Sequence, residues 1–233
     1  MKISKISAAV LSVGMLLGVA AHAADAPFTT TGSFAITSDY LYRGVSQSSN
    51  TAAVQGSFTL SHESGLYASV WGSSIAFSNG LELDPSIGFA GKAGEVGYDV
   101  GVLRYGYPGN TDTLPFTEVY GSVSYMGGKF GLAYSDNFFA ETGKSLYSYL
   151  EYSKEVGGFG VMAHVGYNKF DEAALDPVDG YIDYKLGVSK SVGGVGFELA
   201  YIGSDLDDAE CAGFGGDPTL CEGRVVVTAS KSF

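Results

Sequence analysis

The sequence predicts an all-β fold: a single antiparallel transmembrane β-barrel of about twelve strands, connected as an up-and-down meander. Three observations predict it. Apolar and polar residues alternate with period 2 from Ser33 onward, glycine-rich turns recur along the chain, and the composition favours strands and turns. The 233 residues include 34 Gly, 16 Tyr and 14 Phe but only 16% charged residues, so the chain is too apolar and aromatic to be disordered.

The first 23 residues have the pattern of a cleaved secretory signal peptide. Lys2 and Lys5 precede an apolar stretch over 6–20, and Ala21-His22-Ala23 offers the small residues that signal peptidase reads. The stretch is shorter than the roughly 20 residues of a membrane-spanning helix. We therefore expect export through the inner membrane, cleavage near Ala23, and an outer-membrane barrel over 24–233.

Removal of Lys2 and Lys5 leaves 11 of the 13 basic residues against 25 acidic residues, a formal charge of −14. Binding to nucleic acid depends on Lys and Arg contacts to phosphates, so this balance argues against a nucleic-acid partner.

Twelve strands are expected in chain order, and no later segment has the i, i+3, i+4, i+7 pattern of an amphipathic helix, so no helix is expected. The expected strands are 33–42, 51–62, 66–77, 81–91, 96–106, 116–126, 129–139, 146–155, 159–169, 181–191, 195–204 and 223–233.

Five tight turns alternate with longer, acidic connections. Gly127-Gly128, Gly157-Gly158 and Gly193-Gly194 are variants of one turn, with looser copies at 94–97 and 64–67. The longer connections lie near 43–50, 107–114, 140–145, 170–180 and 204–223, with a short one near 78–80. Tight turns at one end and longer loops at the other are typical of outer-membrane barrels, and an even number of strands places both ends of the barrel at the tight turns.

A soluble β-barrel or sandwich is the structural alternative, because periodicity alone does not tell which stripe faces outward. Two features favour the membrane. The more apolar stripe carries aromatic residues near strand ends, such as Phe130, Tyr152 and Phe159, and the opposite stripe is Gly, Ser, Thr and scattered charge. The last strand ends on Phe233, which resembles the C-terminal signal for the outer-membrane assembly machinery, although Lys231 interrupts its apolar run.

The stripes predict which side chains face lipid and which face the lumen. Val161, Val165, Ile182, Leu186, Phe197 and Leu199 are expected to face lipid, and His164, Asp183, Lys185 and Glu198 to point inward. The predicted pore-lining residues are Asp39, Glu82, Asp84, Asp99, Glu118, Glu151, Asp183 and Glu198, with the bases Lys185 and Arg224. In a water-filled passage such an excess of carboxylates enriches cations. The alternative is that these charges pair with one another and plug the barrel.

Arg43 directly follows the first expected strand, among aromatic residues. We interpret it as an interfacial residue whose guanidinium extends to the polar surface. Pairing with Asp39 at the pore mouth and binding to a lipopolysaccharide phosphate are the alternatives.

Cys211 and Cys221 are the chain's two cysteines, and in an exported protein they predict one disulfide. The carboxylates around them could bind Ca²⁺, but their spacing does not resemble an EF-hand loop. A solvated acidic loop is favoured, and no metal or cofactor is expected.

His62 and His164 do not form the His–Ser arrangement of a hydrolase. His62 lies near a tight turn, and His164 lies in mid-strand, where it is expected to fill the lumen. No catalytic residue is assigned.

The segments Ser38-Asp39-Tyr40-Leu41-Tyr42-Arg43-Gly44-Val45-Ser46-Gln47-Ser48, His62-Glu63-Ser64-Gly65-Leu66-Tyr67 and Trp71-Gly72-Ser73 resemble the TorF-type family of outer-membrane porins of Gram-negative bacteria. The resemblance implies an outer-membrane β-barrel that forms a pore, and it provides no substrate and no functional residue.

The sequence thus predicts a channel for passive passage of small solutes or ions that prefers cations. Its expected partners are outer-membrane lipid, lipopolysaccharide, the assembly machinery and the permeating solutes. One alternative is a non-conducting structural or surface-interaction barrel whose loops contact lipopolysaccharide or Ca²⁺. Another is a lipid-modifying outer-membrane enzyme.

Overall fold

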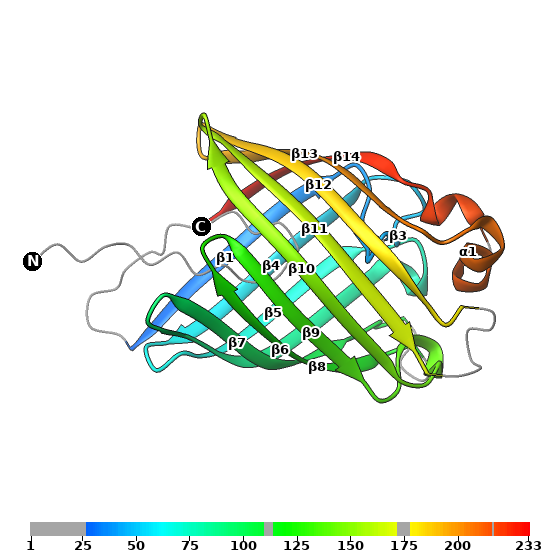
Figure 1. Ribbon diagram of the computed structural model, residues 1–233, viewed down its shortest axis with the longest axis horizontal. Helices are drawn as coiled ribbons and strands as arrows, with labels where there is room; N and C mark the ends of the chain where they lie inside the picture. Colours follow the sequence, from blue (N-terminus) through cyan, green and yellow to red (C-terminus); the bar gives the residue numbers. More distant parts are fainter. Residues whose placement is uncertain (1–26, 110–113, 172–177, 216) are drawn as a thin grey trace, which may run out of the picture.

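The computed structural model describes residues 27–109, 114–171, 178–215 and 217–233, and it forms a closed antiparallel barrel of twelve strands (Figure 1). The barrel strands are β1 (Phe28–Thr37), β4 (Ala53–His62), β5 (Leu66–Ser74), β6 (Leu81–Ala93), β7 (Val96–Tyr105), β8 (Phe116–Tyr125), β9 (Gly128–Ser135), β10 (Ser145–Val156), β11 (Phe159–Phe170), β12 (Gly180–Val192), β13 (Val195–Ser204) and β14 (Arg224–Ser232). Neighbouring barrel strands pair in chain order, and β1 closes the barrel against β14. The predicted fold class, strand number and meander order are confirmed, whereas the predicted signal peptide lies outside the described residues.

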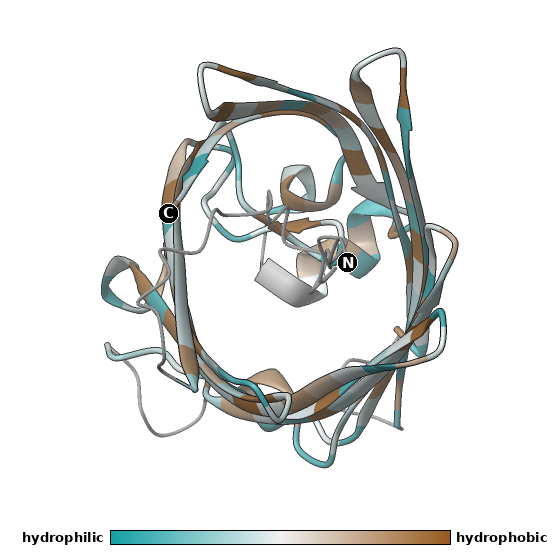
Figure 2. Ribbon diagram, turned by 90° about the vertical axis from the view of Figure 1, so that its left-hand side faces the viewer, coloured by the Kyte–Doolittle hydropathy of each residue, from teal (hydrophilic) through white to brown (hydrophobic). Residues whose placement is uncertain are grey.

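The exterior of the barrel is apolar, as a surface in hydrocarbon must be. Leu186 and Leu199 are 60% and 56% exposed, and Val165, Ile182 and Phe197 also face outward. Asp183, which follows Ile182 in the sequence and points inward, is only 4% exposed. The predicted stripe orientation is therefore correct. Viewed along the barrel, the strands close into a ring with part of the chain crossing its interior (Figure 2).

Glycines at positive φ form the tight turns. Gly157 and Gly158 have φ values of 60° and 80°, and Gly193 and Gly194 have values of 60° and 76°. Such left-handed glycine pairs match the twist of the antiparallel strands that they join, and positive φ values are unfavourable for residues that have a Cβ. All five expected tight turns are present at the end of the barrel opposite α1 (Figure 1).

Other glycines make room for tyrosine rings on the inner wall. A Cβ at Gly131 would overlap Tyr149, and one at Gly166 would overlap Tyr147. Each ring thus lies flat across a neighbouring strand at a position where the wall has no side chain. This packing accounts for glycines that lie within strands rather than in turns.

The connection between β1 and β4 folds into the barrel as a two-stranded hairpin of β2 (Leu41–Tyr42) and β3 (Val45–Ser46). The expectation of a barrel strand over 33–42 was wrong, because β1 begins at Phe28 and ends at Thr37. The Asp39 carboxylate accepts hydrogen bonds from the Ser46 and Ser48 hydroxyls, both at 2.7 Å, and these bonds turn the chain inward. We call residues 38–52 the inner loop.

The loops contain short helices: η1 (Ser78–Gly80), η2 (Phe139–Glu141), α1 (Asp208–Gly215) and η3 (Pro218–Cys221). The expectation of no helix was therefore wrong for α1. Asp207 Oδ1 accepts hydrogen bonds from the Ala209 and Glu210 amides, and Glu210 Oε2 accepts one from the Asp207 amide. These reciprocal bonds form a capping box, which stabilises α1 although this short helix has no apolar face. No helix among the described residues has the length and apolar character needed to cross a membrane.

The loop that carries α1 and η3 is closed by the predicted disulfide, which joins Cys211 and Cys221. Asp217 is the N-cap of η3, and its side chain accepts hydrogen bonds from the Thr219 amide and hydroxyl. These bonds hold the pKa of Asp217 below its usual value. Carboxylates of this loop thus serve as helix caps.

Candidate functional site in the barrel lumen

The inner loop divides the lumen into two cavities. The inner cavity, of about 220 Å³, extends from the hairpin toward the tight turns and reaches Ser33 and Ser232. The outer cavity, of about 380 Å³, lies on the long-loop side of the hairpin. Tyr42 lines both cavities and therefore lies between them.

Arg43, at the tip of the hairpin, is buried inside the barrel. Its Nη2 lies 2.7 and 2.9 Å from the two carboxylate oxygens of Glu118, and its guanidinium carbon lies 3.9 Å from the ring centroid of Tyr147. Nη1 lies 3.4 Å from Asn168 Oδ1. The interpretation of Arg43 as an interfacial residue was wrong, because the inner loop turns its side chain into the lumen, and its carboxylate partner is Glu118 rather than Asp39.

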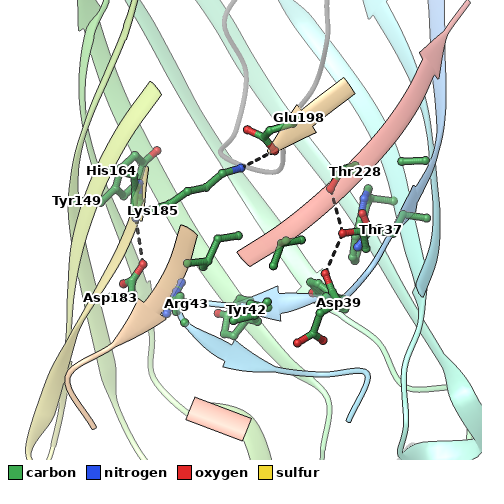
Figure 3. Close-up of a pocket in the computed structure, with 18 of the residues that line it drawn as sticks. Thr37, Asp39, Tyr42, Arg43, Tyr149, His164, Asp183, Lys185, Glu198 and Thr228 are labelled. Carbon is green, nitrogen blue, oxygen red and sulfur yellow. Dashed lines mark hydrogen bonds and ion pairs between the residues drawn. The ribbon is translucent and has the colours of Figure 1, made fainter. Parts of the chain in front are cut away.

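Five of the eight predicted lumen carboxylates form ion pairs with basic groups. Glu118 pairs with Arg43, Asp39 with Arg224 at 2.9 Å, and Glu198 with Lys185 at 2.9 Å. Glu151 and Asp183 flank the imidazole of His164, at 3.7 and 3.1 Å. Figure 3 shows Asp183 beside His164, and Lys185 beside Glu198.

The imidazole of His164 also lies within hydrogen-bond distance of the Tyr147 hydroxyl, at 2.9 Å. The side chain of His164 thus lies against two tyrosines and two carboxylates, and it occupies the lumen as the sequence predicts.

The other three carboxylates have no ion pair among the described residues. Glu82 and Asp84 lie on β6 and Asp99 lies on the adjacent β7, and all three are buried. They accept hydrogen bonds from neutral donors: the Tyr107 hydroxyl, the Gly106 amide and the Tyr67 hydroxyl, respectively. The wall formed by β6 and β7 is therefore the side of the lumen whose carboxyl groups form no ion pair among the described residues.

Two interior bases were missed in the sequence. Arg43 was assigned to the surface, and Lys129, the first residue of the expected strand 129–139, was not among the predicted pore-lining residues. Lys129 is 9% exposed, and its Nζ lies 5.5 Å from the ring centroid of Tyr149. Its alternation with the outward Phe130, Leu132 and Tyr134 could have revealed it. With these two, eight carboxylates face four Lys and Arg side chains and His164.

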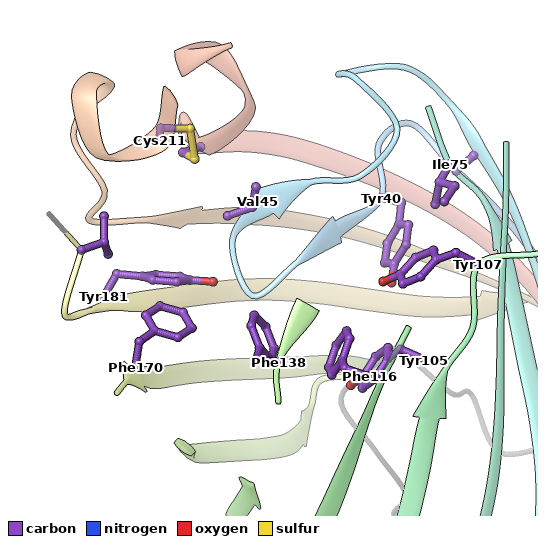
Figure 4. Packing of buried hydrophobic residues seen from close by; sticks show 13 residues of the cluster. Tyr40, Val45, Ile75, Tyr105, Tyr107, Phe116, Phe138, Phe170, Tyr181 and Cys211 are labelled. Atoms are coloured by element: carbon purple, nitrogen blue, oxygen red, sulfur yellow. A yellow bond between two sulfur atoms is a disulfide. The ribbon is translucent and has the colours of Figure 1, made fainter. Parts of the chain in front are cut away.

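Aromatic residues fill much of the long-loop end of the barrel. Tyr105 and Phe116 stack with ring centroids 4.1 Å apart, and Phe138 lies 4.6 Å from Phe116 and 5.6 Å from Phe170 (Figure 4). Tyr40 and Val45 of the inner loop belong to the same buried cluster. Apolar packing thus holds the inner loop in place along with the Arg43–Glu118 ion pair.

The inner loop is also tied to the disulfide-closed loop. Arg224 contacts Asp39 and Asn50 of the inner loop as well as the carbonyl of Thr219, and Asn50 Nδ2 donates to Thr219 Oγ1 at 2.9 Å. Thr219 lies between the two cysteines. The two loops therefore form one connected structure over the mouth of the barrel. No group of three or more metal-ligating side chains occurs among the described residues.

A protein family described as "Bacterial protein of unknown function (Gcw_chp)" matches residues 21–233. The chain belongs to this Gcw_chp family. No curated protein matches it significantly in sequence.

Two solved structures share the fold of this Gcw_chp chain. The KdgM porin is 10% identical, with a TM-score of 0.55 over 87% of this chain and 99% of that one. The NanC porin is 8% identical, with a TM-score of 0.51 over 86% of this chain and 97% of that one. At these identities the similarity concerns the barrel fold.

Proposed function

We propose that this protein is an outer-membrane channel that lets small solutes or ions pass passively and prefers cations. The observation that carries the proposal is a polar, charged lumen inside a closed barrel whose exterior is apolar. A soluble barrel would bury the apolar stripe and expose the charged one, since exposing so many Leu, Val and Phe side chains to water is unfavourable. The resemblance to TorF-type porins points in the same direction.

The cation preference follows from the charge balance of the lumen. Eight carboxylates face Arg43, Lys129, Lys185, Arg224 and His164, and the unpaired carboxylates gather on β6 and β7. An excess of carboxylates over bases in a narrow passage raises the local concentration of cations and repels anions.

A non-conducting structural barrel is the second candidate, and the packed inner loop favours it. Planar-bilayer recordings of the refolded protein in a KCl gradient separate the two functions. A cation-preferring channel gives current steps, and its reversal potential in the KCl gradient is shifted toward the equilibrium potential of K⁺. If neither the wild-type chain nor a variant lacking residues 41–46 gives current, the protein is a structural barrel.

A further inference from the structure

The outer cavity has the size and lining of a small-molecule site. Its volume of about 380 Å³ lies within the range of about 300–1,000 Å³ that is usual for such sites. Phe77, Tyr107 and Phe139 come from three separate loop segments, and their ring centroids lie 5.6–6.0 Å from one another. No Lys, Arg, Asp or Glu is among the described residues that line the cavity.

A buried carboxylate with one unpaired oxygen lies behind this aromatic lining. The hydroxyl of Tyr107 donates to Glu82 Oε1 at 3.3 Å, while Glu82 Oε2 has no hydrogen-bond partner although the residue is 98% buried, its exposure being 2%. Asp84, two residues further along β6, also lacks an ion pair among the described residues. The cavity thus has two buried carboxyl groups without a cationic partner on one side, and a cation bound beside them favours their ionised form.

Arg43, a base that contacts rings of this lining, has a carboxylate partner of its own. Arg43 is held by both carboxylate oxygens of Glu118. Its guanidinium carbon lies 4.8 Å from the ring centroid of Tyr42 and 5.9 Å from that of Phe138, and both rings also line the outer cavity. The molecule itself therefore shows that rings of this lining accept a cation on their faces.

We propose that the outer cavity binds a small organic cation, an ammonium group carried on an apolar body. The apolar body fills the space between the rings, and the ammonium group is stabilised by the ring faces and by the carboxylate of Glu82. A neutral molecule of the same shape gains only the apolar contact, and an anion is repelled. This inference rests on the proposed channel, because it names the class of solute that would enter it.

Calorimetric titration of the refolded full-length chain in detergent tests the proposal with three probes of similar shape: benzylammonium, benzyl alcohol and benzoate. We expect benzylammonium to bind saturably and about tenfold more tightly than benzyl alcohol, with no binding of benzoate. Equal binding of the ammonium and the alcohol, or tighter binding of benzoate, would overturn the proposal. Because no current is measured, the outcome is separate from that of the bilayer recordings.

Two variants locate the site. Glu82→Gln should weaken benzylammonium binding about tenfold and leave benzyl alcohol unchanged, whereas Phe139→Leu should weaken both. Glu95→Gln removes the same charge from an exposed tight turn and should change neither. If Glu82→Gln does not fold, as judged by its circular dichroism, Asp84→Asn takes its place. An ammonium affinity that survives both carboxylate changes would contradict the proposal.

Discussion

Arg43 is the residue on which the shape of the lumen depends most directly. Its guanidinium is buried, forms an ion pair with Glu118 on β8 and lies over the ring of Tyr147 on β10. The tip of the hairpin is therefore fixed to two strands that lie across the barrel from β1. A buried ion pair of this kind contributes little net stability compared with an apolar pair, but removing one partner leaves an uncompensated charge. The pair therefore acts mainly to hold the inner loop in one position.

Arg43→Ala should loosen the inner loop and raise single-channel conductance, with a shift toward cations because Glu118 becomes uncompensated. The stability cost should be about 3 kcal/mol in urea unfolding in lipid vesicles. The double variant Arg43→Ala, Glu118→Ala should regain much of this stability. Arg104→Ala, at an exposed arginine on β7, is the control and should leave conductance unchanged. Wild-type conductance in Arg43→Ala would show that the pair does not restrict the passage.

The inward position of residues such as Asp183, Glu198 and His164 follows from period 2 alone, because adjacent residues in a strand point to opposite faces. Their partners do not follow from it. Arg43 and Glu118 are 75 residues apart, and they meet only because a loop bends into the lumen. Tyr40 and Tyr42 continue the every-second-residue spacing of Phe34 and Ile36, so this spacing did not indicate that β1 ends at Thr37.

Two elements at the mouth of the barrel depend on each other: the inner loop and the disulfide-closed loop. Gly44, next to Arg43, has φ of 81°, and its Cα lies against the backbone of Gly203 at the end of β13. Asn50, Thr219 and Arg224 connect the two loops further out. The disulfide was predictable from two cysteines in an exported chain, but its contact with the inner loop was not, because it depends on the fold of both loops.

Gly44→Ala should displace the hairpin. An added Cβ would lie 2.6 Å from the Gly203 carbonyl oxygen, and the positive φ is unfavourable for alanine. We expect higher conductance and a lower melting temperature. Gly94→Ala is the matched control, since its φ of 64° is also positive but its Cβ would have no atom within 4 Å. If both variants behave alike, backbone strain alone explains the effect and the contact with Gly203 has no role.

The double variant Cys211→Ser, Cys221→Ser should loosen both loops at once. A disulfide that closes so short a loop contributes about 2–3 kcal/mol. Hydrogen exchange should rise over 205–215 and also over 38–50, while the barrel strands keep their protection. A reducing agent should have the same effect on the wild-type chain and none on the variant. Unchanged exchange over 38–50 would mean that the inner loop is held by its aromatic contacts and Arg43 alone.

At the scale of the whole molecule, the barrel separates an apolar exterior from a charged interior, and the interior charge is unevenly distributed. The bases and His164 lie with their carboxylate partners on β8 to β14 and on the inner loop, whereas Glu82, Asp84 and Asp99 lie together on β6 and β7. The barrel and its strand number were predictable, because hydrophobic alternation and glycine turns are local signals. The side-to-side asymmetry was not, since it depends on which strands face each other across the lumen.

This asymmetry gives the last prediction. Glu82→Gln, Asp84→Asn and Asp99→Asn together should move the reversal potential in a KCl gradient toward zero, because they remove the lumen carboxylates that form no ion pair with a base. The wild-type preference should weaken as salt is raised, since the screening length falls from about 10 Å at 0.1 M to about 3 Å at 1 M. The control combines Glu63→Gln, Glu95→Gln and Asp136→Asn, which remove equal charge from exposed turns and should change selectivity little. If the triple variant on β6 and β7 is as cation-selective as the wild-type channel, the preference arises instead from the paired carboxylates of the opposite wall.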